Sequence, residues 1–223
     1  MSEAPIRSRI LDEARELFVA QGAAAVTMRG VAARVGVTPM ALYRYFASRE
    51  ELLAALVGQG HATFLRYLSR SLHERTPLAR LAAAGEQYLR FALEHPQSYA
   101  VMFMERDVPV GPAAEGGEEV ATFRFLVDRI RDCAAAGELR VDDAEEAALV
   151  VWAHVHGLVS LHLAGKLQLD ERDFADLYRR SVEALLHGFA SSSAAAAGRA
   201  GRPSSSAGRA PARRARVRAS RGG

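Results

Sequence analysis

Apolar side chains recur every three or four residues along most of the chain, and this spacing restricts the possible folds more than any other feature of the sequence. Near the start, Ile6, Ile10 and Ala14 lie four residues apart, and the pattern ends at Gly22. Such a repeat gathers apolar side chains on one face of an α-helix. No alternating strand pattern of useful length occurs. The sequence therefore predicts an all-α fold of about nine helices.

Helix-capping residues mark where these helices begin. Thr27, Thr38 and Ser48 each stand before a helical stretch, and Pro39 follows Thr38 at the first helical position. Ser48 also begins a Ser-x-x-Glu capping box, which predicts a long helix to about Arg75. We expect the main internal loop at residues 107–119. Further helices are expected at residues 77–95, 97–105, 120–136, 143–165 and 170–189.

The charge of the chain is unevenly distributed. The net charge is +3, yet the residues after Ala190 carry eight arginines and no acidic side chain, so residues 1–190 have a net charge of −5. The arginine-rich stretch contains almost no large apolar side chain, and we expect it to be disordered. The sequence thus predicts four segments: residues 1–50, a connecting helix at 51–75, a second domain at 76–190, and a tail at 191–223.

Several classes of protein are disfavoured by what the sequence lacks. There is no run of about 18 apolar residues to cross a membrane, and the charged N-terminus does not resemble a secretory signal. The single cysteine, Cys133, cannot form an internal disulfide. No nucleophile or phosphate-binding motif is found. We therefore expect a cytoplasmic protein that is not an enzyme and holds no cofactor.

Three histidines near residue 160 raise the question of a metal site. His154 and His156 are two residues apart on a predicted helix, about 200° around its axis, so they cannot share one ion. His154 and His162 are eight residues apart, without an acidic residue one turn beyond either. We expect no metal site, and one of these histidines to form hydrogen bonds inside the core.

The first fifty residues have the layout of a helix-turn-helix. Two short helices are separated by the turn at residues 36–38, and a longer helix precedes them. Gly36 permits a left-handed backbone in the turn, while Leu42 and Phe46 lie four residues apart and face inward. The flanks and outer face of the second helix, where a DNA major groove would lie, then present Pro39, Met40, Ala41, Tyr43, Arg44 and Tyr45.

Polar residues around this second helix suit contact with DNA phosphates. The hydroxyl groups of Tyr43 and Tyr45 can donate to phosphate oxygens. Arg49 lies in the first turn of the following helix, where an anion is favoured, and Thr27 and Arg29 begin the preceding helix. The alternative is that both tyrosines pack inside a plain three-helix domain.

The stretch TMRGVAARVGVTPMALYRYFASREELLAAL resembles the N-terminal DNA-binding domain of the tetracycline-repressor (TetR) family, over about residues 6–56. Gly30 stands where an acidic residue is frequent in that family, and Arg49 where lysine is usual. The resemblance implies base-edge contacts from Arg29 and from residues 38–41, which include Thr38. It implies contacts with the DNA backbone from Thr27, Tyr43, Tyr45 and Arg49.

The second domain resembles one class of C-terminal domain in this family. Trp152, His156 and Gly157 resemble its tryptophan–histidine–glycine signature, and FALEHPQSYAVMFM resembles the stretch before its central loop. Large apolar side chains spread over several helices predict a ligand cavity of roughly 300–1,000 Å³. The alternative is that they simply fill the core. The predicted lining residues are Tyr88, Phe91, Tyr99, Met102, Phe103, Phe125, Trp152 and His156.

The last two helices carry apolar stripes that suit a dimer. Two such helices from each of two subunits would form a four-helix bundle. One recognition helix alone contacts few bases, which favours this interpretation, but a stripe can also pack within its own subunit. The predicted interface residues are Val151, Val155 and Leu158 on one helix and Phe174, Leu177, Val182 and Leu185 on the other.

Together these features predict a homodimeric, ligand-responsive regulator of transcription. It would act as a repressor that a small apolar effector releases from a palindromic operator in double-stranded DNA. An activator of the same fold would bind DNA in the same way. The sequence also leaves open a helical enzyme that uses the region around His154 and His156, and an interaction protein with a vestigial helix-turn-helix. The tail at residues 191–223 either adds affinity for phosphates or has no role in DNA binding.

Overall fold

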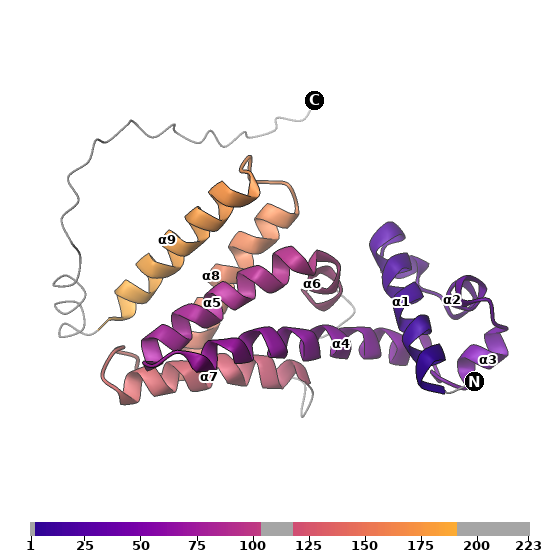
Figure 1. Cartoon of the computed structure of the whole chain (residues 1–223), viewed down its shortest axis with the longest axis horizontal. Helices are drawn as coiled ribbons and strands as arrows, with labels where there is room; N and C mark the ends of the chain where they lie inside the picture. Colours follow the sequence, from indigo (N-terminus) through magenta and orange to yellow (C-terminus); the bar gives the residue numbers. More distant parts are fainter. Residues whose placement is uncertain (1–2, 104–117, 191–223) are drawn as a thin grey trace.

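The computed structural model describes residues 3–103 and 118–190, and within these ranges the chain forms nine α-helices and no strand (Figure 1). The predicted all-α fold is confirmed. Most of the predicted loop at 107–119, and the whole tail at 191–223, lie outside the described residues. The helices are α1 (Glu3–Gln21), α2 (Met28–Val35), α3 (Pro39–Tyr43), α4 (Arg49–Ser69), α5 (Pro77–Glu94), α6 (Pro96–Phe103), α7 (Glu118–Ala135), α8 (Ala144–Leu163) and α9 (Glu171–Phe189).

Local capping chemistry explains where the first helices begin. The side chains of Thr27, Thr38 and Ser48 each accept a hydrogen bond from the backbone N–H three residues later, at 3.0, 3.2 and 3.1 Å. Gly36, with φ +78°, ends α2 in the left-handed conformation expected of the turn. Two 3₁₀ helices, Ala23–Ala25 and Arg70–His73, were not predicted.

Two helices end earlier than the sequence predicts. α3 stops at Tyr43 rather than near Phe46, because Arg44 and Tyr45 donate to carbonyl groups three residues back and tighten the last turn. α4 stops at Ser69 rather than near Arg75 and continues as the 3₁₀ helix Arg70–His73. Both changes leave the order of the elements as predicted.

The buried apolar side chains form two separate cores. The N-terminal core joins α1, α2 and α3 to the first half of α4, and the C-terminal core joins the second half of α4 to α5–α9. Figure 1 shows α4 extending from the three N-terminal helices along the C-terminal bundle. α6 also contributes to both cores, since Val101 belongs to the N-terminal core and Met102 to the C-terminal one.

A close approach between α4 and α6 depends on a glycine. A Cβ atom at Gly60 would lie 2.6 Å from Sδ and 2.7 Å from Cγ of Met102, which is fully buried. Such distances are too short for a real contact, so a larger residue at position 60 would displace the buried Met102 side chain or separate the two helices. The crossing that connects the two cores is therefore packed around a glycine at this point.

We expect Gly60→Ala to destabilise the protein although alanine is the better helix former. Overpacking of a filled core costs about 1–3 kcal/mol, whereas the gain in helix propensity is about 1 kcal/mol. Urea denaturation followed by circular dichroism would measure the difference. Gly85→Ala is the matched control, because its Cβ would lie 3.7 Å from Val182 in ordinary contact. Equal stability of the Gly60→Ala variant and the wild type would contradict this view of the crossing.

Candidate DNA-binding surface and effector cavity

The outer face of α3 is exposed in the way that the sequence predicts. Leu42 and Phe46 are fully buried, whereas Met40 is 76% and Tyr43 49% exposed. Tyr45 is half-buried and packs against the N-terminal core, so it combines a packing role with a partly accessible ring. Of the remaining predicted residues, Ala41 is half-buried, and the exposed ones are Thr27, Arg29, Thr38, Pro39 and Arg44.

This surface is locally basic, although residues 1–190 are acidic overall. Residues 17–49 contain four arginines and no aspartate or glutamate. Arg34 is bound by Glu13 and Glu16 of α1, at 2.7 and 2.6 Å. Arg29 and Arg44 are exposed and form no ion pair with any residue that the structure describes. These two guanidinium groups are therefore free to meet phosphate oxygens.

Arg49 has a structural role that the sequence did not reveal. Its Nε donates to the carbonyl of Val26 at 2.8 Å, and one terminal nitrogen donates to the carbonyl of Ala23 at 2.7 Å. These bonds fix the short segment before α2 to the start of α4. Contact between Arg49 and phosphate stays a prediction, and it would have to use the remaining N–H groups.

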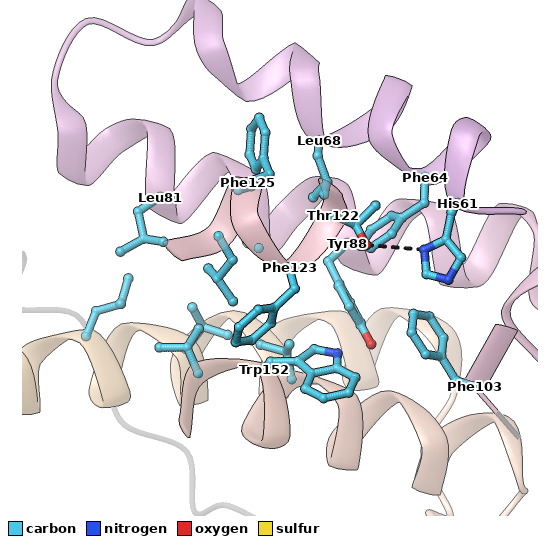
Figure 2. Close-up of a pocket in the computed structure, with 17 residues that line it drawn as sticks. His61, Phe64, Leu68, Leu81, Tyr88, Phe103, Thr122, Phe123, Phe125 and Trp152 are labelled. Carbon is cyan, nitrogen blue, oxygen red and sulfur yellow. Dashed lines mark hydrogen bonds between the residues drawn. The ribbon is translucent and has the colours of Figure 1, made fainter. Parts of the chain in front are cut away.

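The C-terminal core encloses a cavity of about 70 Å³, lined by residues of α4–α9 (Figure 2). This is smaller than the volume predicted from the sequence, because aromatic rings occupy much of the space. Tyr88, Phe103, Phe125 and Trp152 line the cavity as predicted. The other lining residues include His61, Phe64, Leu68, Leu81, Thr122, Phe123, Leu126, Val151, Val155, Val182 and Leu186.

Four residues predicted for the cavity lie elsewhere. Phe91 packs against Phe64, with ring centroids 4.9 Å apart, and Met102 lies against Gly60. Tyr99 and His156 form hydrogen bonds with each other behind the cavity wall. An aromatic residue on a buried helix can fill the core or face a void, and sequence spacing alone does not distinguish these positions.

Among the residues that the structure describes, the cavity wall contains no charged side chain. Its polar groups are those of His61, Thr122, Tyr88 and Trp152, and Nδ1 of His61 lies 3.2 Å from Oγ1 of Thr122. Burial lowers the pKa of His61 to about 4, so the imidazole is neutral near pH 7. In Figure 2, His61, Tyr88, Phe103 and Trp152 lie toward one end of the cavity and Leu81 toward the other. The cavity thus suits an uncharged, mainly apolar molecule.

A buried hydrogen-bond network connects the cavity wall to α6. The Tyr99 hydroxyl lies 2.7 Å from Nδ1 of His156, 3.2 Å from the Tyr88 hydroxyl and 3.3 Å from Oγ of Ser160. Burial raises the pKa of both tyrosines and lowers that of His156, so all three are neutral near pH 7. Tyr88 lines the cavity, whereas Ser160 and His156 do not. Ser160 and His156, both on α8, therefore connect this helix to Tyr99 of α6 and do not face the cavity as a nucleophile and base.

Four of the predicted dimer-interface residues were assigned to the wrong face. Val151, Val155, Phe174 and Val182 are buried within their own subunit, and the three valines line the cavity. Leu158, Leu177 and Leu185 are half-buried. The sequence showed that each helix has an apolar face, but not that this face is covered by the subunit's own core.

The exposed apolar surface of α8 lies on the side of the helix opposite to the buried Val151 and Val155. Leu149 is 49%, Val150 44% and Leu161 46% exposed. By length and composition alone, α8 is also apolar enough to cross a membrane, but this is weak evidence because a helix that packs in a bundle passes the same test. In the structure, α8 packs on α5, α7 and α9.

His162 and Cys133 have the surroundings of residues that pack in the core. His162 stacks on Phe174, with ring centroids 3.9 Å apart. Across residues 3–103 and 118–190, no group of three or more potential ligand side chains comes together to hold a metal. Burial raises the pKa of Cys133 to about 12, which keeps the thiol protonated and unreactive.

Comparison with known proteins identifies both parts of the chain. A family model described as "Bacterial regulatory proteins, tetR family" matches residues 10–56, and one described as "Tetracyclin repressor-like, C-terminal domain" matches residues 81–185. The chain belongs to the TetR family of bacterial transcriptional regulators. The second match includes Trp152, His156 and Gly157, on which the resemblance of the C-terminal domain rested.

Curated TetR-family relatives resemble part of the chain. It is 32% identical over 117 residues to the transcriptional activator FasR of Mycolicibacterium smegmatis, covering 52% of this chain and 53% of FasR. It is 27% identical over 150 residues to the transcriptional regulator UidR of Escherichia coli K12, covering 62% of this chain and 71% of UidR. The match to FasR thus spans about half of that protein's length.

Solved structures share the fold over most of the chain. A Rhodococcus sp. RHA1 protein of unknown function has a TM-score of 0.71 at 26% identity, covering 83% of this chain and 96% of that one. A tetR-family regulatory protein from Rhodococcus RHA1 has a TM-score of 0.65 at 23% identity, covering 85% and 98%. The arrangement of helices is therefore that of the TetR fold.

We expect the stability of the protein to depend on pH through His61. Its pKa is about 4 in the folded chain and near 6.5 when unfolded. Between pH 6.5 and pH 4 the unfolded state binds a proton at His61 that the folded state does not. The free energy of unfolding therefore falls as the pH drops from 6.5 to 4, and His61 has no effect on it above pH 6.5. The loss should be about 1–3 kcal/mol.

Denaturation of the wild type and of His61→Gln at several pH values would test this. Glutamine does not titrate, so the variant should lose less stability between pH 6.5 and 4 while other groups titrate equally in both proteins. Parallel pH profiles for the two proteins would contradict the assignment.

Proposed function

We propose that this TetR-family chain is a homodimeric, DNA-binding repressor that a small apolar effector releases from a near-palindromic operator. The observation that carries the proposal is the exposed face of α3, where Met40 and Tyr43 project from a helix held by the buried Leu42 and Phe46. The membership of the chain in a family of transcriptional regulators supports it.

DNA contacts follow from the position of each side chain. Met40 and Ala41 would meet base edges and thymine methyl groups in the major groove. Arg29 and Arg44 would bind phosphates by charge, and the Tyr43 hydroxyl would donate to one. Thr27 and Thr38 cap helices with their oxygens, and each hydroxyl can still donate its proton to a phosphate.

The dimer would form through the exposed stripe of α8, defined as Leu149, Val150, Ala153, Gly157 and Leu161. At 100° per residue these five positions share one side of the helix. Small residues at 153 and 157 allow close approach of a second helix. The half-buried Leu177, Ser181 and Leu185 would extend the interface on α9. A dimer places two copies of α3 on half-sites about 34–36 Å apart, one turn of DNA.

The effector would act by changing the position of α6. A ligand in the cavity meets Tyr88, which is hydrogen-bonded to Tyr99 on α6, and Val101 on the same helix is buried in the N-terminal core. Moving α6 would therefore shift the DNA-binding helices. The effector can favour such a state only through its higher affinity for it.

Activation of transcription is the second candidate. FasR, the relative with 32% identity, is named a transcriptional activator, and the same DNA-binding geometry serves either role. The position of the operator relative to the promoter of the regulated gene decides between repression and activation.

Selection of genomic DNA fragments by the purified protein, at low and at physiological salt, tests the proposal. An inverted repeat that remains bound at physiological salt, with at least two chains per site, is the expected result. The contrary result is enrichment of DNA fragments that share no motif. If this enrichment disappears at physiological salt and after removal of residues 191–223, only the tail binds DNA.

We expect Tyr43→Phe to weaken operator binding without affecting the fold. The change removes one hydroxyl from a half-exposed ring, and the loss of a hydrogen bond to a charged phosphate costs about 1–2 kcal/mol, or roughly 5- to 30-fold in affinity. Fluorescence anisotropy with labelled operator DNA would measure it, and thermal unfolding should be unchanged. Unchanged affinity would mean that Tyr43 serves only in packing.

We expect Leu161→Glu to dissociate the dimer. A carboxylate at this position of an apolar helix–helix interface would be buried without a partner, which is strongly unfavourable. Analytical ultracentrifugation would then show a monomer. Leu72→Glu is the matched control, because Leu72 is 44% exposed but lies on the 3₁₀ helix Arg70–His73, outside the stripe. An intact dimer of the Leu161→Glu variant would place the interface elsewhere.

A further inference from the structure

A surface groove between α5 and α9 lies against the outside of the cavity wall. Its volume is about 560 Å³. Gly85, Val182 and Leu186 line both the groove and the cavity, so they form the wall between the two volumes. The groove is further lined by Leu78, Ala79, Ala82 and Ala83 of α5, and by Tyr178, Arg179, Glu183 and His187 of α9.

Neither volume alone makes a sufficient ligand site. The cavity measures about 70 Å³, whereas pockets for small molecules usually measure about 300–1,000 Å³. The groove is large enough but open to solvent, and it would leave one side of a ligand in water. A molecule that extended from the groove into the cavity would have both the space and the burial that it needs.

We infer that the cavity and the groove are two halves of one ligand site, which admits an elongated lipophile without negative charge between α5 and α9. The inference rests on the proposed function, in which an apolar effector occupies the cavity. It adds the route of the ligand, its shape and the sign of charge that it cannot carry.

The wall between the two halves is thin, and few polar interactions hold its two helices together. Gly85 has no side chain, and a Cβ atom there would lie 3.7 Å from Val182 and 3.9 Å from the Tyr178 hydroxyl. The Tyr178 hydroxyl donates to the carbonyl of Gly85 at 3.0 Å. At the surface, Arg179 binds both carboxylate oxygens of Glu86, at 2.9 and 3.1 Å. An exposed ion pair of this kind contributes little to stability, so the Tyr178 hydrogen bond is the main polar link that must break for α5 and α9 to separate locally.

The charges along this path disfavour an anion. The cavity wall carries none, and a buried anion without a partner is strongly unfavourable. The groove contributes the carboxylates of Glu74, Glu86 and Glu183. Arg179 is already bound by Glu86 and Asp176, and the other basic side chain, His187, lies one turn beyond Glu183. From the lining residues at positions 3–103 and 118–190, a ligand with a carboxylate or sulfonate would therefore meet acidic side chains and no free guanidinium group.

The groove remains open in the proposed dimer. At 100° per residue, Arg179 and Glu183 lie about 120–160° around α9 from Leu177 and Ser181, which extend the proposed interface. A ligand can then reach each subunit independently of its partner.

Two matched fluorescent probes test the inference on the full-length protein. N-phenyl-1-naphthylamine is uncharged, and 8-anilinonaphthalene-1-sulfonate has the same rings with a sulfonate added. Trp152 is the chain's single tryptophan and lines the cavity, so quenching of its emission reports a probe inside. We expect the neutral probe to quench Trp152 and the sulfonate to bind at least tenfold more weakly.

Variants of the wall test the route in both directions. In stopped-flow measurements Gly85→Leu, which fills the wall, should slow association of the neutral probe at least tenfold. Gly85→Ala, whose Cβ fits in ordinary contact, should bind at the wild-type rate. Val182→Ala, which removes part of the wall, should speed association. Circular dichroism and thermal unfolding confirm that each variant is folded.

The outcomes separate the inference from the proposed function. If the neutral probe associates at the wild-type rate with both Gly85→Leu and Val182→Ala, the proposed entry route between α5 and α9 is wrong. Equal affinity for the two probes overturns the exclusion of anions. If neither probe quenches Trp152 in the wild type, the effector cavity itself is wrong and the inference falls with it. Operator binding by the same preparations is measured separately and decides whether the DNA-binding part of the proposed function survives.

Discussion

The two hydrophobic cores meet where α6 crosses α4, and in the proposed mechanism the effector acts on DNA binding through the packing at this crossing. Val101 and Met102 are consecutive residues, yet the first belongs to the N-terminal core and the second to the C-terminal core. Gly60 allows the backbones to approach, because any side chain there would collide with Met102. Protein interiors are close-packed, so we expect a shift of α6 to be transmitted to both cores.

The hydrogen-bond network behind the cavity keeps α6 in register with the C-terminal bundle. Tyr99 of α6 is held by Tyr88 of α5 and by His156 of α8. Buried polar groups are stable only when each has a partner, so these three helices have one favoured alignment. A ligand group that bonded to the Tyr88 hydroxyl would compete with Tyr99. In the proposed mechanism, ligand binding and the position of α6 are thus coupled through this hydroxyl and through Phe103 of α6, which lines the cavity.

The helix starts could be predicted because capping depends on residues close in the chain, such as Ser48 and the N–H group three residues later. The cavity lining was predicted only in part, and four residues predicted for a dimer interface are buried in their own subunit, because an apolar face does not specify its partner. α8 is apolar around much of its circumference, so the buried Val151 could not be told from the exposed Leu149.

His61 and Phe64 were missed because α4 was predicted as a connecting element. Their spacing along one face of that helix was the signal that could have placed them in the cavity wall.

The distribution of arginines explains how residues 1–190, with a net charge of −5, can present a DNA-binding surface. Of the four arginines in residues 17–49, Arg34 and Arg49 are bound internally and stabilise the helix-turn-helix, which leaves Arg29 and Arg44 for phosphates. Each neutralised phosphate contributes about −0.9 to the slope of log affinity against log salt. With so few free cations, the folded part gains little affinity for DNA of arbitrary sequence. Tight binding must then come from the fit of α3 in the major groove, which favours discrimination between sequences over affinity for the backbone.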